Sequence, residues 1–185
     1  MKLTELVLEH IEITQRTKEA SCEHNGGPSD LSPMLVWVNG LDETSVAIIE
    51  VKNSVLESMP QVLSLLIKQN PKVVMFICES YAVKLDKTEL QEFQDTHKSG
   101  DLAKIYAEHG PLSGVDELIA FNALDTDTGE QVQGYTRFHY NDIGLPVFGE
   151  TEVHSLEHGQ LDQANTTMIF NQFYKYIQIK RAENN

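Results

Sequence analysis

The spacing of apolar residues predicts a helix near each end of the chain. Over residues 3–18, apolar side chains recur every three or four positions, and acids occupy much of the remaining surface. The apolar residues at this spacing are Leu3, Leu6, Val7 and Ile11, and the polar residues His10 and Thr14 share it. Residues 166–181 show a similar spacing, although alternation near the end of this segment also suits a strand. The number of periodic matches favours a helix there.

Between these two helices the pattern predicts strands and further helices. Runs rich in β-branched and aromatic residues, bounded by turn-forming residues, are typical of strands. They cover residues 34–39, 45–51, 73–83, 115–125, 130–140 and 152–156. Helical spacing or capping patterns cover residues 58–70, 88–98 and 101–109. The order of these elements predicts an α+β fold, with a mainly antiparallel sheet of about five strands and helices on one face.

A polar segment separates the first helix from the rest of the chain. Residues 21–33 contain the sequence Asn-Gly-Gly-Pro-Ser-Asp and almost nothing that can pack in a core. We therefore expect residues 1–20 to form an N-terminal helical arm and residues 21–33 to form a flexible linker. Residues 34–185 would then form a single α+β domain. The arm would dock on that domain or on a second copy of the chain.

The chain is strongly acidic, which limits its partners. It has 28 Asp and Glu residues against 14 Lys and Arg residues, and a formal net charge of −14. Direct binding of nucleic-acid phosphates depends on clustered Lys and Arg, so we expect none. Acids interrupt the first turn of the chain, and no apolar run approaches the length of a membrane span. We therefore expect a cytoplasmic protein with no membrane partner.

The two cysteines have different surroundings. Cys22 lies in a polar segment, and Cys78 lies within a predicted apolar strand. One pair of cysteines in a chain of this length is not a disulfide framework, so we expect both thiols to stay reduced. Burial in the strand would raise the pKa of Cys78 and weaken it as a nucleophile.

Glu79 is the most informative residue because it interrupts an apolar strand. Side chains alternate across a sheet, so Glu79 and Tyr81 would share a face with apolar neighbours. A carboxylate there needs a cation or hydrogen-bond donors, which Arg137 and His139 of a later strand could supply. One interpretation is a buried Glu–Arg pair that fixes the strand register. The other is a ligand-binding site, which would comprise Glu79, Tyr81, Arg137 and His139.

Two histidines and an acid form a second pattern. His154, Glu157 and His158 match the inverted zinc-protease pattern, in which one helix presents two imidazoles and a carboxylate acts as the base. Gly159 closes the segment at once, and its apolar residues give little helical amphipathicity. We therefore treat these three residues as metal ligands only in an alternative interpretation, and we expect no cofactor.

An acidic turn lies between the fourth and fifth predicted strands. The segment Asp125-Thr-Asp-Thr-Gly-Glu130 suggests a calcium loop, but it lacks a third acidic ligand before the glycine and a distal glutamate. We expect a hairpin turn there.

Residues 58–140 resemble a loose group of small uncharacterised proteins of bacteria and their phages. In that group a helix that begins near Leu-Pro leads to a hydrophobic strand ending in a Ser-Glu-Ala-Trp-like sequence, and a hairpin with an acidic turn follows. The matching features are Met59-Pro60, the run from Val73 to Ile77 with Cys78-Glu79-Ser80-Tyr81, and Asp125-Thr-Asp-Thr-Gly129. Only the Glu of the four-residue signature is identical. The resemblance implies an order of elements but no activity.

Together these features predict a non-catalytic interaction or assembly protein, derived from a phage or mobile element. Its partner would be another protein or a second copy of the chain. The prediction depends on the acidity, the separate amphipathic helix and the lack of a convincing catalytic set. The alternative is a metal-dependent hydrolase or small-ligand enzyme that uses the Glu79 cluster or the pair His154 and His158.

Overall fold

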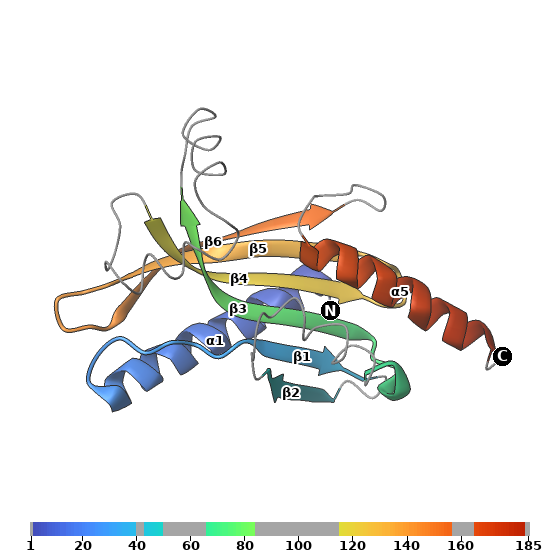
Figure 1. Cartoon of the computed structure of the whole chain (residues 1–185), viewed down its shortest axis with the longest axis horizontal. Coiled ribbons are helices and arrows are strands. Elements are labelled where there is room, and N and C mark those ends of the chain that lie inside the picture. Colours follow the sequence, from blue (N-terminus) through green and yellow to red (C-terminus); the bar gives the residue numbers. More distant parts are fainter. Residues whose placement is uncertain (1, 40–42, 50–65, 84–114, 157–164, 184–185) are drawn as a thin grey trace, which may run out of the picture.

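The chain folds around one antiparallel sheet of six strands, in the order β2-β1-β3-β4-β5-β6 (Figure 1). The computed structural model describes residues 2–39, 43–49, 66–83, 115–156 and 165–183. The strands are β1 (Met34–Val38), β2 (Thr44–Ile48), β3 (Val73–Val83), β4 (Val115–Asp125), β5 (Gln131–Tyr140) and β6 (Pro146–Leu156). The described helices are α1 (Leu3–Asn25), the short 3-10 helix η1 (Ile67–Gln69) and α5 (Asn165–Glu183). The α+β class and the antiparallel sheet are confirmed, with six strands instead of about five.

The two long helices cover opposite faces of the sheet. Val73, Met75 and Ile77 of β3 lie in a core with α1, on what we call the α1 face. Val74 and Phe76 lie in a second core with α5, on the α5 face. In Figure 1, α5 crosses in front of the sheet and α1 passes behind it. The helix on the second face is α1, which the sequence predicted as a separate arm; an unbroken apolar run at the start of β3 requires cover on both sides.

The helices predicted near the two ends of the chain are both present. α1 buries Leu3, Leu6, Val7 and Ile11 and continues to Asn25, so residues 21–25 of the predicted linker are helical. Segment 166–181 lies within α5, which confirms a helix instead of a strand. The predicted helices at 88–98 and 101–109, and most of the one at 58–70, lie outside the described residues.

The hairpin between β4 and β5 is confirmed, and its first acid organises the turn. Asp125 Oδ1 accepts hydrogen bonds from the backbone N–H groups of Asp127 and Thr128, at 2.8 and 2.9 Å. Gly129 completes the turn with φ +79°, a conformation that favours glycine. The carboxylate of Asp125 thus binds the backbone of its own turn.

Strand β6 is longer than predicted, and its backbone leaves no room for a side chain at Gly134 of β5. It begins at Pro146, whereas the pattern predicted a strand only at 152–156. A Cβ atom at Gly134 of β5 would collide with the backbone carbonyl oxygen of Glu152 and would lie 2.6 Å from the ring of Phe121. Only glycine therefore allows this approach of the two strands.

Candidate functional site

Glu79 forms a buried ion pair with a lysine of α1. Lys18 Nζ lies 2.8 Å from Glu79 Oε2, and the two side chains are 0% and 9% exposed. The same carboxylate oxygen accepts a 2.8 Å hydrogen bond from the backbone N–H of Leu31. One acid of β3 therefore binds both α1 and the segment that leads from α1 to β1.

The ammonium group of Lys18 has further partners. It donates a 2.9 Å hydrogen bond to the carbonyl oxygen of Ser29. It also lies 4.6 Å from the centre of the Phe138 ring and 5.3 Å from the centre of the Tyr140 ring. The faces of aromatic rings attract a cation. A carboxylate, a carbonyl and two aromatic rings thus compensate the buried charge of Lys18.

The need for a partner at Glu79 is confirmed, but the predicted partner was wrong. Glu79 pairs in register with Ile119, which pairs with Thr136 on the next strand. Residues paired in this way share one face of the sheet, so Thr136 and Glu79 lie on the α1 face. Arg137 follows Thr136 and therefore lies on the α5 face, as does His139. The structure does not bring these two residues together with Glu79.

A sequence signal for Lys18 exists. Ile11, Thr14 and Lys18 follow one another at spacings of three and four residues, and all three are buried. Lys18 therefore continues the apolar stripe of α1. A lysine in a buried stripe is rare unless it is paired, so its position points to an acid on the opposing sheet.

Arg137 belongs to an exposed polar cluster on the α5 face. Tyr135 Oη donates a 2.7 Å hydrogen bond to Glu152 Oε2, and Arg137 Nη2 donates a 3.2 Å hydrogen bond to Tyr135 Oη. The bond to Glu152 raises the pKa of the Tyr135 phenol above its ordinary value. His139 is exposed farther along β5, and Tyr81 lies on β3, two strands away. The proposed ligand-binding residues are thus distributed over both faces.

The histidine pattern does not begin on a helix. His154 is an exposed residue of strand β6, opposite Gln133 of β5. Glu157 and His158 lie outside the described residues. The inverted zinc-protease pattern requires both histidines on one helix, which the position of His154 in β6 contradicts. In the described part of the chain, no three His, Cys, Asp or Glu side chains lie close enough to hold a metal ion together.

The two cysteines are free, as expected. Cys22 is buried on α1, and Cys78 is partly buried on the α5 face. Burial, followed by the negative charge of Glu79, raises the pKa of the Cys78 thiol to about 11. This confirms the expected effect of burial on this thiol. Burial and the charge of Glu79 also raise the pKa of Tyr140, which favours a neutral phenol near the ion pair.

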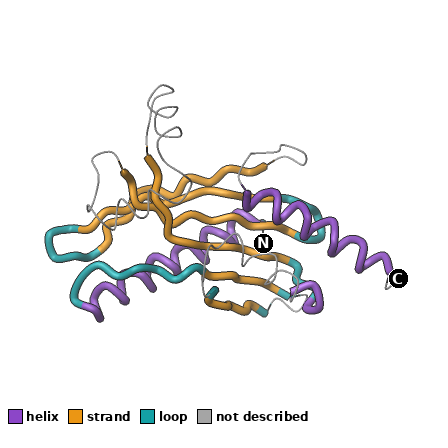
Figure 2. Tube along the Cα trace, in the orientation of Figure 1, coloured by secondary structure: helices purple, strands orange, loops and turns teal. Residues whose placement is uncertain are grey.

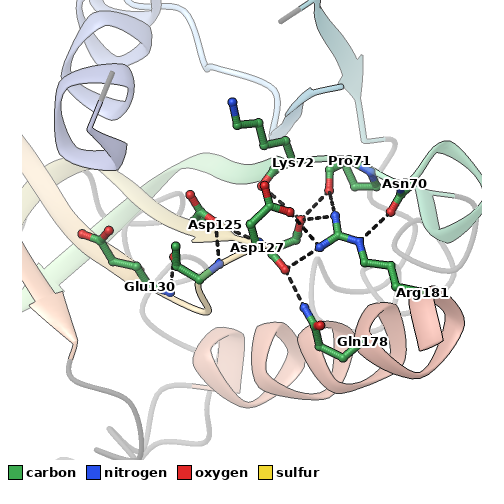
Figure 3. Close-up of polar contacts among 10 residues, drawn as sticks. Asn70, Pro71, Lys72, Asp125, Asp127, Glu130, Gln178 and Arg181 are labelled. Atoms are coloured by element: carbon green, nitrogen blue, oxygen red, sulfur yellow. Dashed lines mark hydrogen bonds and ion pairs between the residues drawn. The ribbon is translucent and has the colours of Figure 1, made fainter. Parts of the chain in front are cut away.

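Arg181 fastens the end of α5 to the sheet (Figure 3). Its Nε donates a 2.9 Å hydrogen bond to Asn70 Oδ1. Its Nη1 donates a 2.9 Å hydrogen bond to the carbonyl oxygen of Thr126 and lies 2.8 Å from Asp127 Oδ1. The side-chain amide of Gln178, one turn earlier, donates a 2.7 Å hydrogen bond to the same Thr126 carbonyl oxygen. These bonds join α5 to the β4–β5 turn and to the segment before β3, and sequence reasoning did not identify them.

Strand β2 is an edge of the sheet with outward-facing backbone groups. In the part of the chain that the structure describes, no strand lies beyond it. The N–H of Ile49 donates a 2.8 Å hydrogen bond to the carbonyl oxygen of Pro33, so alternate residues from Ile49 backward bond toward β1. The intervening residues turn their N–H and C=O groups outward. They are Thr44, Val46 and Ile48.

The side chains of β2 are uncharged, and two of them are exposed apolar groups. Val46 and Ile48 are 56% and 71% exposed. The other edge, β6, carries the exposed acids Glu150 and Glu152. Charged side chains on an edge strand hinder pairing with another strand. Of the two edges, β2 is therefore the one suited to accept a further strand.

Comparison with known proteins adds no assignment. No family model matches the chain, and no curated protein or solved structure matches it significantly. None of the described helices is long and apolar enough to cross a membrane.

Proposed function

We propose that this protein is a non-catalytic interaction module that binds an extended protein segment along β2. The observation that carries the proposal is the β2 edge, whose outward backbone groups lie beside exposed Val46 and Ile48. In strand addition, backbone hydrogen bonds provide affinity and alternate side chains provide specificity. The edge offers both.

The burial and pairing of Glu79 support a non-catalytic role. Its Oε2 atom is bound by Lys18 and by the N–H of Leu31, and its side chain is 9% exposed. A catalytic carboxylate must reach a substrate or a water molecule. In this proposal Glu79 joins α1 to the sheet and takes no part in a reaction.

The proposal includes a cytoplasmic setting and an origin in a phage or mobile element. Free Cys22 and Cys78 suit a reducing compartment. The origin is supported by the resemblance of residues 58–140 to small proteins of bacteria and their phages. Both parts are independent of the binding role of β2, and either can be wrong while the binding role holds.

Amide exchange measured by NMR tests the binding role. The probe is a synthetic heptapeptide of alternating threonine and valine with a lysine at each end, and the control is the same peptide with proline at its centre. At a protein concentration at which the chain is monomeric, the outward N–H groups of Thr44, Val46 and Ile48 should exchange more slowly with the probe. Those of Ser45 and Ala47 already face β1 and should not change. Unchanged exchange of all five amides at a millimolar probe concentration would refute strand addition at β2.

A further inference from the structure

We infer that the strand bound by β2 is the β2 strand of a second copy of this chain. The two strands would pair antiparallel around a two-fold axis that passes beside Val46. The inference rests on the proposed function of the β2 edge and adds the identity of the partner strand. It predicts one continuous sheet that runs through both copies, with β2 of each copy at its centre.

The backbone of β2 is complementary to itself in this register. Thr44, Val46 and Ile48 of each copy turn their N–H and C=O groups outward. With Val46 opposite the same residue of the second copy, Thr44 lies opposite the second copy's Ile48. Each opposed pair then exchanges two hydrogen bonds, so every outward group of the strand finds a partner. A shift by one residue would oppose outward groups to inward ones and lose these bonds.

The side chains of the same residues also match. Val46 and Ile48 lie on the α1 face, because they pair with Val36 and Met34 of β1. In the two-fold register, valine meets valine at the centre and isoleucine meets threonine on either side. All of these side chains are β-branched, and such pairs pack well across antiparallel strands. The exposed apolar surface of Val46 would be covered by Val46 of the second copy.

Charge favours β2 over the other edge as a contact between copies. Each copy carries a formal net charge of −14, so two copies repel one another. The repulsion is smallest where the contact surface itself is uncharged, and the segment Thr44–Ile48 has no charged residue. Glu150 and Glu152 would oppose self-pairing at β6. Figure 2 shows β2 at the margin of the sheet, on the side opposite β6.

The salt dependence of binding distinguishes a second copy of the chain from a basic protein partner. Like-charged copies associate more tightly when salt screens them, whereas a basic segment binds an acidic protein less tightly. Raising the ionic strength from about 0.01 M to about 1 M shortens the screening length from about 30 Å to about 3 Å. The inference therefore predicts that dimerisation strengthens as salt increases.

Sedimentation equilibrium over a range of protein concentrations provides the first test. Wild type should show a reversible monomer–dimer equilibrium. Val46→Lys places like charges directly opposite one another and should weaken dimerisation by about fivefold. The matched control is Val147→Lys, which introduces the same charge at an exposed valine of the other edge strand, 42% exposed, and should leave dimerisation unchanged.

Disulfide formation provides a second test that does not depend on disruption. In a hydrogen-bonded antiparallel pair the Cα atoms lie about 5.5 Å apart, within the range that a disulfide spans. Val46→Cys should form a covalent dimer under mild oxidation. Ser45→Cys, whose side chain points to the opposite face, should remain largely monomeric.

The outcomes separate the inference from the proposed function. A dimer that dissociates in Val46→Lys, strengthens with salt and is trapped by Val46→Cys supports both. A chain that stays monomeric while the threonine–valine probe still protects the β2 amides refutes the second copy and keeps the binding role. A dimer that Val46→Lys leaves intact also overturns the inference, because its interface lies elsewhere. Absence of both dimer and probe binding refutes both.

Discussion

Lys18 and Glu79 show how a single pair can determine where a helix docks. Both charges are removed from water, so neither is stable in place without the other. We expect Lys18→Met to lower the free energy of unfolding by about 3–5 kcal/mol, because it leaves an uncompensated carboxylate in the core. Urea denaturation measures this loss. The control is Arg16→Met, which removes an exposed ion pair with Glu12 on the same helix and should change stability by less than about 1 kcal/mol.

A double variant separates lost charge compensation from lost packing. Adding Glu79→Gln to Lys18→Met neutralises the carboxylate and keeps an oxygen for the N–H of Leu31. Replacing both members of a buried pair by neutral groups often restores stability. We expect the double variant to recover more than half of the loss. If it is as unstable as Lys18→Met, the contacts of Lys18 with Phe138 and Tyr140 account for the effect instead of the pair.

The raised pKa of Cys78 predicts a loss of stability at high pH. The thiol titrates at about 11 in the folded chain, against an ordinary value of 9.0. Below pH 9 both states hold the proton, and stability does not depend on this group. Between pH 9 and 11 the unfolded chain releases the proton first, so the folded state loses stability as pH rises, by about 2–3 kcal/mol in total.

The measurement is the difference between wild type and Cys78→Ser, which has no thiol to ionise. Plotted against pH, the free energies of unfolding of the two proteins should differ by a constant amount up to pH 9. They should converge toward pH 11 if Cys78→Ser is the less stable protein. The rate of alkylation of native Cys78 by iodoacetamide should reach half its maximum near pH 11. A half-maximum near pH 9 would show an unperturbed thiol.

Helix α5 depends on its last turn as well as on its apolar side. Arg181 is 25% exposed and bonds to Asn70, to Thr126 and to Asp127. We expect Arg181→Ala to destabilise the protein by about 2 kcal/mol, because hydrogen bonds to charged groups contribute about 1.5–3 kcal/mol. Amide exchange in the final turns of α5 should accelerate at the same time.

The neighbouring residue provides the matched control for Arg181. Lys180 pairs with Glu183 on its own helix, and both side chains are more than half exposed. Lys180→Ala should therefore change stability much less than Arg181→Ala does. Equal effects of the two substitutions would mean that the contacts of Arg181 with the sheet do not contribute measurably to stability.

Local patterns predicted most of the elements, because they depend on residues close together in the chain. The spacing of Leu3, Val7 and Ile11 predicted α1, and the run that begins at Val73 predicted β3. The faces of the sheet depend on long-range register, which local patterns do not contain. Placing Glu79 opposite Arg137 required a choice of strand parity, and the choice was wrong by one residue.

The edge strand illustrates a second limit of sequence reasoning. The segment 45–51 reads as an ordinary strand, and nothing in it tells whether a further strand pairs beside it. Only the order of strands identifies β2 as an edge. The cluster around Arg181 has the same cause, because Arg181 and Asn70 are 111 residues apart in the chain. Contacts of this kind appear only when the topology is known.

At the scale of the whole molecule, α1 is part of the core that it covers. Its apolar side lies in the same core as Val73 and Met75 of β3. Gln15 adds a 3.3 Å hydrogen bond to Thr136 of β5, and Lys18 adds the buried pair. Docking of the first helix on its own sheet is one of the two arrangements that the sequence left open.

Deletion of residues 1–20 tests how far the fold depends on this helix. The deletion uncovers the α1 face and leaves Glu79 without Lys18, so we expect the cooperative thermal transition to disappear and light scattering to show aggregates. A synthetic peptide of residues 1–25, added during refolding, should restore the transition. The same peptide with Lys18→Met should restore it less well, because it covers the apolar face but leaves the carboxylate uncompensated. A truncated chain with an unchanged melting temperature would show that the sheet is stable without α1, and that the buried pair has no part in holding the fold together.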